Sequence, residues 1–375
     1  MSAPAGRVFL TGATGFVGME VLVRYLERGT RSVTCLVRAE SDAAARERLD
    51  GVLDGLVANG AELFEHRIEA VAGELTAPDL GLDAATRERL AEETTTIIHC
   101  AASVSFDLPL EEARATNVGG TRRMLDFAAL ANERGGIDRY AQVSTAYVAG
   151  THVGRFTEDD LDVGQDFRNS YEQSKFESEQ MVQADGAGLP WIILRPSIVV
   201  GDRASGWTAA FNVMYWPLRA LSTGLFKAVP AMPESPLDIV SIDYVADAIH
   251  ELCEGHRSET QQTFHLTAGT DASSWGEIVS LASRYFRRPE PKAVPPHEFV
   301  ADPDNLSDVA IEASRIYFPY FSISTVFDNA RTRTRLAQAG IHCTPLREYL
   351  FRLLDFATRS RWGKRPIGRA DALAQ

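Results

Sequence analysis

Residues Val8–Gly18 read V-F-L-T-G-A-T-G-F-V-G, and this stretch decides the fold. Its apolar start has the pattern of a buried strand, and Gly12, Gly15 and Gly18 follow that strand. Apolar residues at helical spacing then run over Phe16–Arg28. Glycine at these points permits a tight turn and lets the backbone approach a pyrophosphate at the helix N-terminus. The stretch therefore predicts a dinucleotide-binding strand, turn and helix.

A tight turn without a ligand is the alternative interpretation of a glycine triplet. The flanks argue against it, because a strand pattern precedes the glycines and a helix pattern follows them. The two equal steps of three residues also differ from the ordinary dinucleotide fingerprint, in which the first two glycines lie closer together.

Short Val- and Ile-rich runs alternate with helix-period segments over the first two thirds of the chain, which is typical of βαβ units. The predicted strands are Arg7–Thr11, Ser32–Arg38, Arg67–Ala72, Thr95–Cys100, Arg139–Ser144, Trp191–Arg195 and Thr263–Leu266. We therefore predict an α/β fold with a doubly wound parallel sheet, that is, a Rossmann fold.

The alternation of strand and helix patterns ends after Gly201, where an aromatic insertion and a Pro-rich loop follow. From Ser273 onward the sequence predicts helices at Trp275–Phe286, Arg331–Ala339 and Leu346–Thr358. We expect residues 1–202 and 237–270 to form the cofactor-binding domain. Residues 203–236 and 271–375 are expected to form a smaller, mainly helical lid region that binds substrate.

The length and net charge of the chain exclude some classes of function. The chain has 375 residues, more than the ~100–200 of a usual domain, so we expect one main core with an elaboration. Its formal charge is 38 − 51 = −13. Binding phosphate backbones requires concentrated positive charge, so we expect no nucleic-acid partner. Apolar runs end well before ~18 residues, so no transmembrane segment is expected, and the oligomeric state stays open.

Four cysteines, Cys35, Cys100, Cys253 and Cys343, lie far apart without a C-x-x-C spacing. They predict buried, reduced thiols in a cytoplasmic protein and no metal site. His99 beside Cys100 is interpreted as a strand end that packs near the cofactor.

Arg38 lies about 20 residues beyond the last glycine, where NAD-selective sites carry an acidic residue against the ribose 2′-hydroxyl. A guanidinium there suits a 2′-phosphate, and Arg48 can supply a second charge. NADPH is therefore the predicted cofactor. The alternative for Arg48 is a solvated helix face.

Tyr171 and Lys175 stand four residues apart in a polar helical pattern, so both side chains leave one face of the helix. An ammonium at this distance is expected to depress the phenol pKa from ~10 toward neutrality. Ser144 and Thr145 follow the fifth strand, at the sheet edge where open α/β sheets bind ligands.

With these motifs the chain resembles the extended short-chain dehydrogenase/reductase superfamily. The shared features are T-G-A-T-G-F-V-G, Asn117, Thr145, the Tyr171/Lys175 pair and L-R-P-S-I-V-V-G at Leu194–Gly201. The resemblance implies that Thr145 hydrogen-bonds the reacting carbonyl and that Tyr171 is the acid. It further implies that Lys175 holds the nicotinamide ribose and that Asn117 supports a proton-relay water.

The cofactor contacts follow from the glycine loop, the two arginines and the resemblance together. They are Gly12, Thr14, Gly15, Phe16, Val17, Gly18, Arg38, Arg48, Gly73, Glu74, Leu75, Ala101, Ala102, Ser144, Lys175, Pro196, Ile198 and Val199. Glu74 stands where many relatives have Asp.

Several stretches are similar to the thioester-reductase branch, which includes male-sterility-type fatty acyl-CoA reductases and terminal reductase domains of carboxylic acid reductases and peptide synthetases. They are C-L-V-R-A, Ala72–Leu82, Ile97–Phe106, Val143–Gly150 and, in the tail, Phe318–Phe321, Val326–Arg331 and Cys343–Leu350. The resemblance implies NADPH-dependent reduction of an acyl thioester to an aldehyde or further to an alcohol. We expect the thioester to arrive on coenzyme A or on a separate acyl carrier protein.

The aromatic insertion predicts an apolar wall for the acyl chain. Its named members are Trp207, Phe211, Met214, Tyr215, Trp216, Leu225 and Phe226, with Trp207, Phe211 and Tyr215 as the expected substrate contacts. The alternative is that these side chains pack the lid onto the core.

Two other functions remain open. The same fold serves sugar-nucleotide epimerases, dehydratases and hydroxysteroid-type alcohol dehydrogenases, although Ala146 and Tyr147 replace the acidic residues that dehydratases commonly carry beside Thr145. A non-catalytic NADP-binding sensor is the other alternative, but a sensor has no need of Thr145, Tyr171 and Lys175 together.

Overall fold

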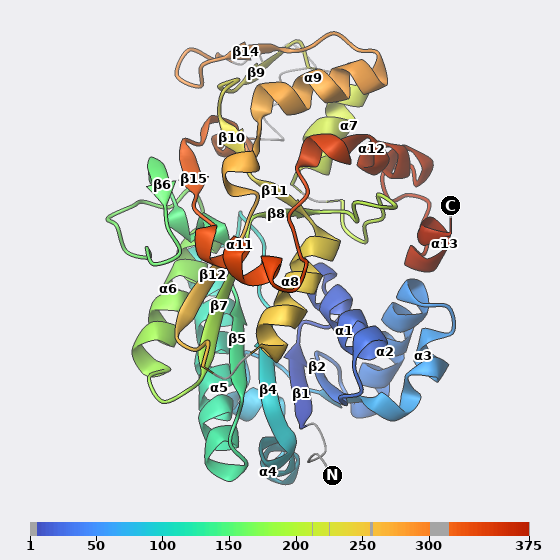
Figure 1. Cartoon of the computed structure of the whole chain (residues 1–375), viewed down its shortest axis with the longest axis vertical. Helices are drawn as coiled ribbons and strands as arrows, with labels where there is room; N and C mark the ends of the chain where they lie inside the picture. Colours follow the sequence, from blue (N-terminus) through green and yellow to red (C-terminus); the bar gives the residue numbers. More distant parts are fainter. Residues whose placement is uncertain (1–5, 212, 225, 256–257, 301–314, 375) are drawn as a thin grey trace.

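Seven parallel strands form the central sheet of the computed structural model, which describes residues 6–374 except 212, 225, 256–257 and 301–314 (Figure 1). Their order is β12-β7-β5-β4-β1-β2-β3. The strands are β1 (Arg7–Thr11), β2 (Val33–Val37), β3 (Ile68–Ala72), β4 (Thr94–His99), β5 (Arg139–Val143), β7 (Trp191–Pro196) and β12 (Gln262–Leu266). All seven predicted strands are present, and each end lies within one residue of its prediction.

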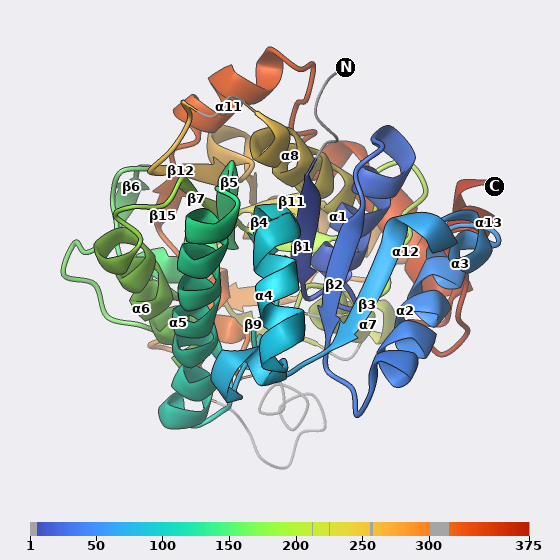
Figure 2. The same ribbon diagram turned by 90° about the horizontal axis from the view of Figure 1, so that it is seen from below.

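Helices cover both faces of the sheet, as Figure 2 shows. One face carries α1 (Phe16–Arg28), α2 (Asp42–Leu56) and α8 (Ile242–Glu254). The other carries α4 (Ala84–Glu93), α5 (Leu110–Arg134) and α6 (Ser170–Asp185). Because helices cover both faces, most residues of the strands are buried on either side, including polar ones such as Thr96 and His99. The predicted doubly wound Rossmann fold is confirmed.

Helix α5 extends further toward the N-terminus than its apolar pattern over Thr121–Glu133. Gly119 and Gly120 directly precede that pattern and lie inside the helix. Gly120 is buried close to Leu75, since a Cβ added to it would lie 3.5 Å from the Leu75 Cβ. Tertiary packing therefore carries the helix across two residues of low helix propensity.

The strand order reverses at β1, which pairs with β2 on one side and with β4 on the other. Chain connections leave β1 and β4 toward opposite halves of the sheet, which opens a crevice at their carboxyl ends. The site described below occupies this edge.

The insertion and the tail pack together beyond that edge, at the top of Figure 1. Two small strand pairs join them: β9 with β14 in parallel and β10 with β13 antiparallel. The elements involved are α7 (Tyr215–Thr223), β9 (Ala228–Pro230), β10 (Pro236–Leu237), β13 (Ser273–Ser274), α9 (Trp275–Phe286), β14 (Lys292–Val294), η5 (Phe318–Ser322), η6 (Leu346–Glu348), α12 (Leu350–Arg359) and α13 (Arg369–Leu373). β14 was not predicted, because a three-residue strand is too short for a detectable period.

The tail also reaches the sheet. Helix α11 (Ala330–Ala337) packs on β12, and β15 (Thr325–Phe327) pairs with β6 (Gly154–Phe156). The Glu158 carboxylate accepts hydrogen bonds from the backbone N–H groups of His265, Arg331 and Thr332. The division into residues 1–202 with 237–270 and 203–236 with 271–375 stays a prediction.

Several short elements remain in the part of the chain that the structure describes. They are α3 (Gly60–Leu63), η1 (Glu65–Arg67), η2 (Pro78–Gly81), η3 (Ala146–Ala149), β8 (Ile198–Val200), β11 (Ile239–Ser241) and η4 (Gly269–Asp271). Within the described part of the chain, no helix has the length and apolar character needed to cross a membrane.

Candidate active site

A cavity of about 850 Å³ lies at the carboxyl edge of the sheet. The segments that follow six of the seven strands supply its walls. Every predicted cofactor contact lines it: Gly12, Thr14, Gly15, Phe16, Val17, Gly18, Arg38, Arg48, Gly73, Glu74, Leu75, Ala101, Ala102, Ser144, Lys175, Pro196, Ile198 and Val199. The tertiary structure thus brings together residues separated by up to 187 positions, from Gly12 to Val199. Contact of each residue with a bound cofactor stays a prediction.

Close backbone contacts in the loop after β1 explain why Gly12 and Gly18 are glycines. Gly12 has φ +79°, and a Cβ there would lie 2.7 Å from the Ala101 amide nitrogen. A Cβ on Gly18 would lie 2.1 Å from the Gly12 carbonyl oxygen. Helix α1 begins at Phe16 with no side-chain cap and no acidic residue in its first turn. Its first N–H groups and the positive end of its dipole therefore remain available to an anion.

Arg38 and Arg48 lie together at the rim of this cavity. Both are exposed, and the Arg48 guanidinium donates a hydrogen bond to the Arg38 carbonyl oxygen. This hydrogen bond from Arg48 therefore stabilises the loop that carries Arg38. It is an additional role, because the prediction for Arg48 was only a second positive charge. The pair presents a positive edge that suits a phosphate monoester.

The three predicted catalytic side chains converge on the same cavity. Tyr171 and Lys175 project from α6, and Thr145 follows β5. The Thr145 hydroxyl lies close enough to the Tyr171 phenol to act on its pKa. The Lys175 ammonium donates to the Val143 carbonyl oxygen at 2.8 Å. The site therefore holds two hydroxyl donors side by side with a fixed cation one helical turn away.

The expected depression of the Tyr171 pKa is wrong for this arrangement. Burial raises the pKa of Tyr171 to about 12, and the nearby Thr145 hydroxyl offsets only part of that effect. Lys175 is directed to the Val143 carbonyl, and burial lowers its own pKa to about 8 although Glu179 acts in the opposite direction. Tyr171 consequently stays protonated at neutral pH, as a proton donor must.

Ser144, His99 and Cys100 lie near Thr145, Tyr171 and Lys175. The Ser144 hydroxyl is buried and has no hydrogen-bond partner among the described residues. His99 bonds the Thr11 hydroxyl through Nδ1 at 2.8 Å, and burial together with Lys175 lowers its pKa to about 3, so the ring is neutral. Cys100 lines the cavity, in agreement with the prediction that this strand end lies near the cofactor site.

Asn117 lies behind the cavity wall and does not line it. Its Oδ1 accepts from the Ser103 N–H at 2.8 Å, and its Nδ2 donates to the Ser103 carbonyl and the Ser174 hydroxyl. The side chain therefore joins the loop after β4 to helix α6. Its role beside a relay water stays a prediction.

Four aromatic side chains that had no predicted site role also line the cavity: Phe106, Tyr147, Tyr317 and Tyr320. Phe106 lies 5.7 Å from the Tyr171 ring and stacks on Tyr320 at 5.5 Å between centroids. Tyr320 meets Tyr147 edge-on at 5.1 Å. The tail therefore supplies part of the wall beside Tyr171.

A signal for these residues was present in the sequence. Phe106, Tyr147 and the Phe318–Phe321 segment all lie in stretches that carried the resemblance to acyl reductases. What the sequence could not reveal is that three stretches so far apart meet at one wall.

The predicted substrate contacts Trp207, Phe211 and Tyr215 are absent from the lining of this cavity. Trp207 is buried against Phe16 and donates to the Ile367 carbonyl. The Tyr215 hydroxyl accepts from the Gly201 N–H, and Phe211 stacks on Phe356. These contacts favour the alternative interpretation, in which all three pack the lid onto the core. Leu225 lies outside the described residues.

The fold and this site together define the class of protein. A glycine loop at the switch point, with Thr145, Tyr171 and Lys175 around one cavity, defines an oxidoreductase of the extended short-chain dehydrogenase/reductase type. More narrowly, the model of the male sterility protein family matches residues 10–249, and the chain belongs to that family.

Individual relatives agree with this assignment. The chain is 32% identical over 300 residues to nonribosomal peptide synthetase asaC of Aspergillus flavus, a match that covers 75% of this chain and 28% of the relative. It is 30% identical over 320 residues to fatty acyl-CoA reductase 1 of Pongo abelii, covering 75% and 61%. The crystal structure of the terminal R domain from the myxalamid PKS-NRPS biosynthetic pathway superposes with a TM-score of 0.82 at 25% identity, covering 98% and 94%. The chain thus spans less than two thirds of the length of these two curated relatives.

Proposed function

We propose that this protein is an NADPH-dependent reductase of acyl thioesters carried by coenzyme A or by an acyl carrier protein, with an aldehyde as first product. The observation that carries the proposal is the convergence of Thr145, Tyr171 and Lys175 on the cavity that the glycine loop opens. The named relatives, a peptide synthetase and a fatty acyl-CoA reductase, support the thioester as substrate class.

The residues present fit a dinucleotide phosphate. The uncapped start of α1 suits the pyrophosphate, and glycine at 12 and 18 allows the close backbone approach that forms the turn before this helix. The unpartnered Ser144 hydroxyl lies close to where Lys175 reaches the cavity. Arg38 and Arg48 at the rim support NADPH over NADH, because each guanidinium adds donors for a 2′-phosphate.

Bound NADPH supplies a hydride to the thioester carbonyl carbon. The Thr145 and Tyr171 hydroxyls donate hydrogen bonds to the oxygen on which negative charge develops. Tyr171 then gives its proton as the carbon–sulfur bond breaks, which releases aldehyde and thiol. Lys175 supplies a fixed positive charge near the nicotinamide ribose. A second round of the same chemistry on the aldehyde would yield the alcohol.

The mouth of the cavity suits an apolar acyl group more than a sugar nucleotide. Val104 and Ile316 line it while 68% and 43% exposed, and the aromatic wall of Phe106, Tyr317 and Tyr320 continues inward. Exposed apolar side chains at an entrance favour an apolar ligand.

Consumption of NADPH with a panel of acyl-CoA and carrier-bound thioesters, with trapping of the carbonyl product, tests the proposal. We expect aldehyde or alcohol in step with NADPH loss. Turnover of UDP-sugars or hydroxysteroids in place of thioesters would favour an epimerase or alcohol dehydrogenase. Tight NADPH binding without turnover of any class would favour the sensor.

A further inference from the structure

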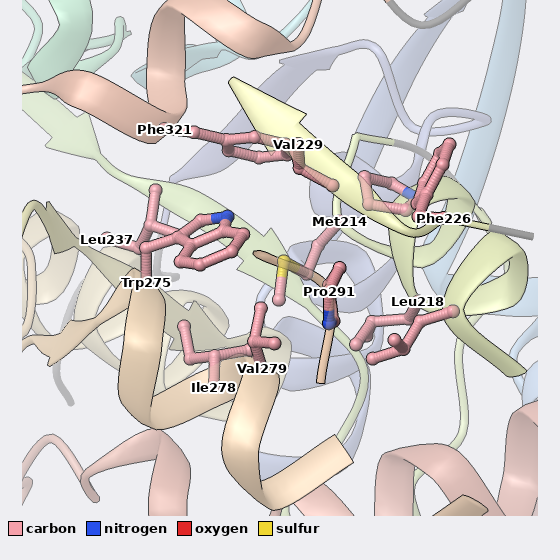
Figure 3. Close-up of a pocket in the computed structure, with 12 residues that line it drawn as sticks. Met214, Leu218, Phe226, Val229, Leu237, Trp275, Ile278, Val279, Pro291 and Phe321 are labelled. Atoms are coloured by element: carbon pink, nitrogen blue, oxygen red, sulfur yellow. The ribbon is translucent and has the colours of Figure 1, made fainter. Parts of the chain in front are cut away.

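A second pocket lies in the lid between α7, α9, β9 and β10, and it is partly open to solvent (Figure 3). Its lining consists wholly of apolar side chains: Met214, Pro217, Leu218, Leu221, Phe226, Val229, Leu237, Trp275, Ile278, Val279, Pro291 and Phe321. Its volume is about 40 Å³. A void of this size has room for a few water-sized groups, yet it offers water no polar side chain.

The two cavities share a wall. Val213 lines the large cavity, whereas the next residue, Met214, lines the small one. The same holds for Tyr320 and Phe321 at the end of the tail segment. At both places neighbouring residues of one chain segment face different cavities, so a single layer of protein separates them.

A continuous apolar path leads from the proton donor to this wall. The Tyr171 ring lies beside Phe106, Phe106 stacks on Tyr320, and Phe321 lies 6.2 Å from Trp275 in the small cavity. A chain attached to a carbonyl at Tyr171 would run along these rings away from the cofactor loop.

Met214 lies where the chain segment passes from the wall of the large cavity to that of the small one. Figure 3 shows its sulfur in the middle of the lining side chains. An unbranched thioether changes rotamer at low cost and adapts to different neighbours, unlike the branched and ring side chains around it. Rotation of this one side chain would enlarge the small cavity toward the large one.

Resting on the proposed function, we propose that the small cavity binds the methyl end of a linear, saturated acyl chain. A polar chain end would lose its hydrogen bonds to water there without gaining others. A branched or aromatic end needs more width than this space offers. A concave pocket with a wholly apolar lining, next to the cavity that holds the reacting carbonyl, suits an apolar part of the same ligand.

Filling the small cavity tests this proposal. Val279 is half-buried on α9, so Val279→Phe can add its ring to the space with little strain elsewhere. We expect kcat/KM for dodecanoyl-CoA to fall at least tenfold, with kcat/KM for butanoyl-CoA unchanged. Val153→Phe, at a side chain 73% exposed, is the matched control and should leave both values unchanged. Met214→Ala should raise the ratio of dodecanoyl to butanoyl activity.

An unchanged ratio in a folded Val279→Phe protein would overturn the proposal while leaving thioester reduction intact. A binding measurement covers the case in which no thioester is reduced. 12-Bromododecanol carries a heavy atom at its far end and should quench Trp275 fluorescence, whereas 1-dodecanol should not. Trp275→Phe should remove the quenching, and Val279→Phe should weaken it. Absence of quenching in the wild type would also overturn the assignment of this cavity.

Discussion

The Tyr320 hydroxyl donates a hydrogen bond to Glu172 Oε1 at 2.7 Å, across 148 residues of sequence. Glu172 directly follows Tyr171, the predicted proton donor, on helix α6, and Tyr320 belongs to the tail. Asn169 donates to the same hydroxyl at 2.8 Å. Burial raises the pKa of Glu172, while Arg168 acts to lower it. The tail is therefore bonded to the start of the helix that carries the catalytic pair.

Tyr320→Phe should destabilise the protein by about 1–3 kcal/mol, because the buried Glu172 oxygen loses its donor while ring stacking on Phe106 is kept. Urea unfolding should show a lower midpoint with an unchanged slope. Tyr317→Phe is the matched control, since only burial and the charge of Asp107 act on the Tyr317 hydroxyl among the residues that the structure describes. Equal midpoints for the two variants would contradict this role of Tyr320.

Tyr171→Phe should lower turnover by ~10²–10⁴-fold, the usual contribution of a positioned proton donor, with NADPH binding near wild type. Lys175→Ala should lower both turnover and NADPH affinity, because the ammonium is expected to contact the ribose. Fluorescence titration with NADPH and single-turnover rates separate the two effects. Retention of more than about a tenth of wild-type turnover by Tyr171→Phe, with hydride transfer rate-limiting, would exclude Tyr171 as the acid.

The buried ammonium of Lys175 should make stability depend on pH. Its pKa is about 8 in the folded protein, below the unfolded value of ~10.4, so the unfolded chain binds more protons between these values. The contribution of Lys175 to the free energy of unfolding therefore rises with pH over this window, by on the order of 3 kcal/mol.

Comparison with Lys175→Met isolates that contribution, because other groups titrate alike in both proteins. The free energy of unfolding of the wild type, minus that of the variant, should increase from pH 8 to ~10.4. A constant difference across this window would show that Lys175 is not desolvated.

Arg38→Ala should lower kcat/KM for NADPH and leave kcat/KM for NADH little changed, because the guanidinium is expected to meet only the 2′-phosphate. Arg48→Ala should have a smaller effect in the same direction, through the loop that it braces. Steady-state kinetics with both cofactors measures the ratio. A wild type that uses the two cofactors equally would refute the predicted preference.

Gly18→Ala should weaken NADPH binding and lower Tm, because the added methyl would meet the Gly12 carbonyl oxygen at 2.1 Å and shift the loop. Gly51→Ala, in the exposed interior of α2, meets no atom within 4 Å and should stabilise the protein by about 0.5–1 kcal/mol. Thermal unfolding with and without NADPH distinguishes the pair. Normal NADPH binding by Gly18→Ala would contradict the tight approach at the loop.

The sheet and the cofactor loop were predictable because their signals are local. Strand β1, the glycines and helix α1 are contiguous, and each buried strand is a short apolar run between turns. The Tyr171/Lys175 pair was predictable for the same reason, since helix periodicity alone places both side chains on one face.

The sequence by itself thus determined the class of fold, the glycine loop and the residue types available for proton donation. Tertiary structure alone decided which aromatic side chains reach the site: Phe106 and Tyr320 do, whereas Trp207 and Tyr215 pack the lid. It also decided the Tyr171 pKa, because burial acts there more strongly than any charge that spacing could reveal. An apolar side chain has the same sequence signal whether it lines a cavity or packs in a core. Only the packing of distant segments therefore distinguishes the two positions.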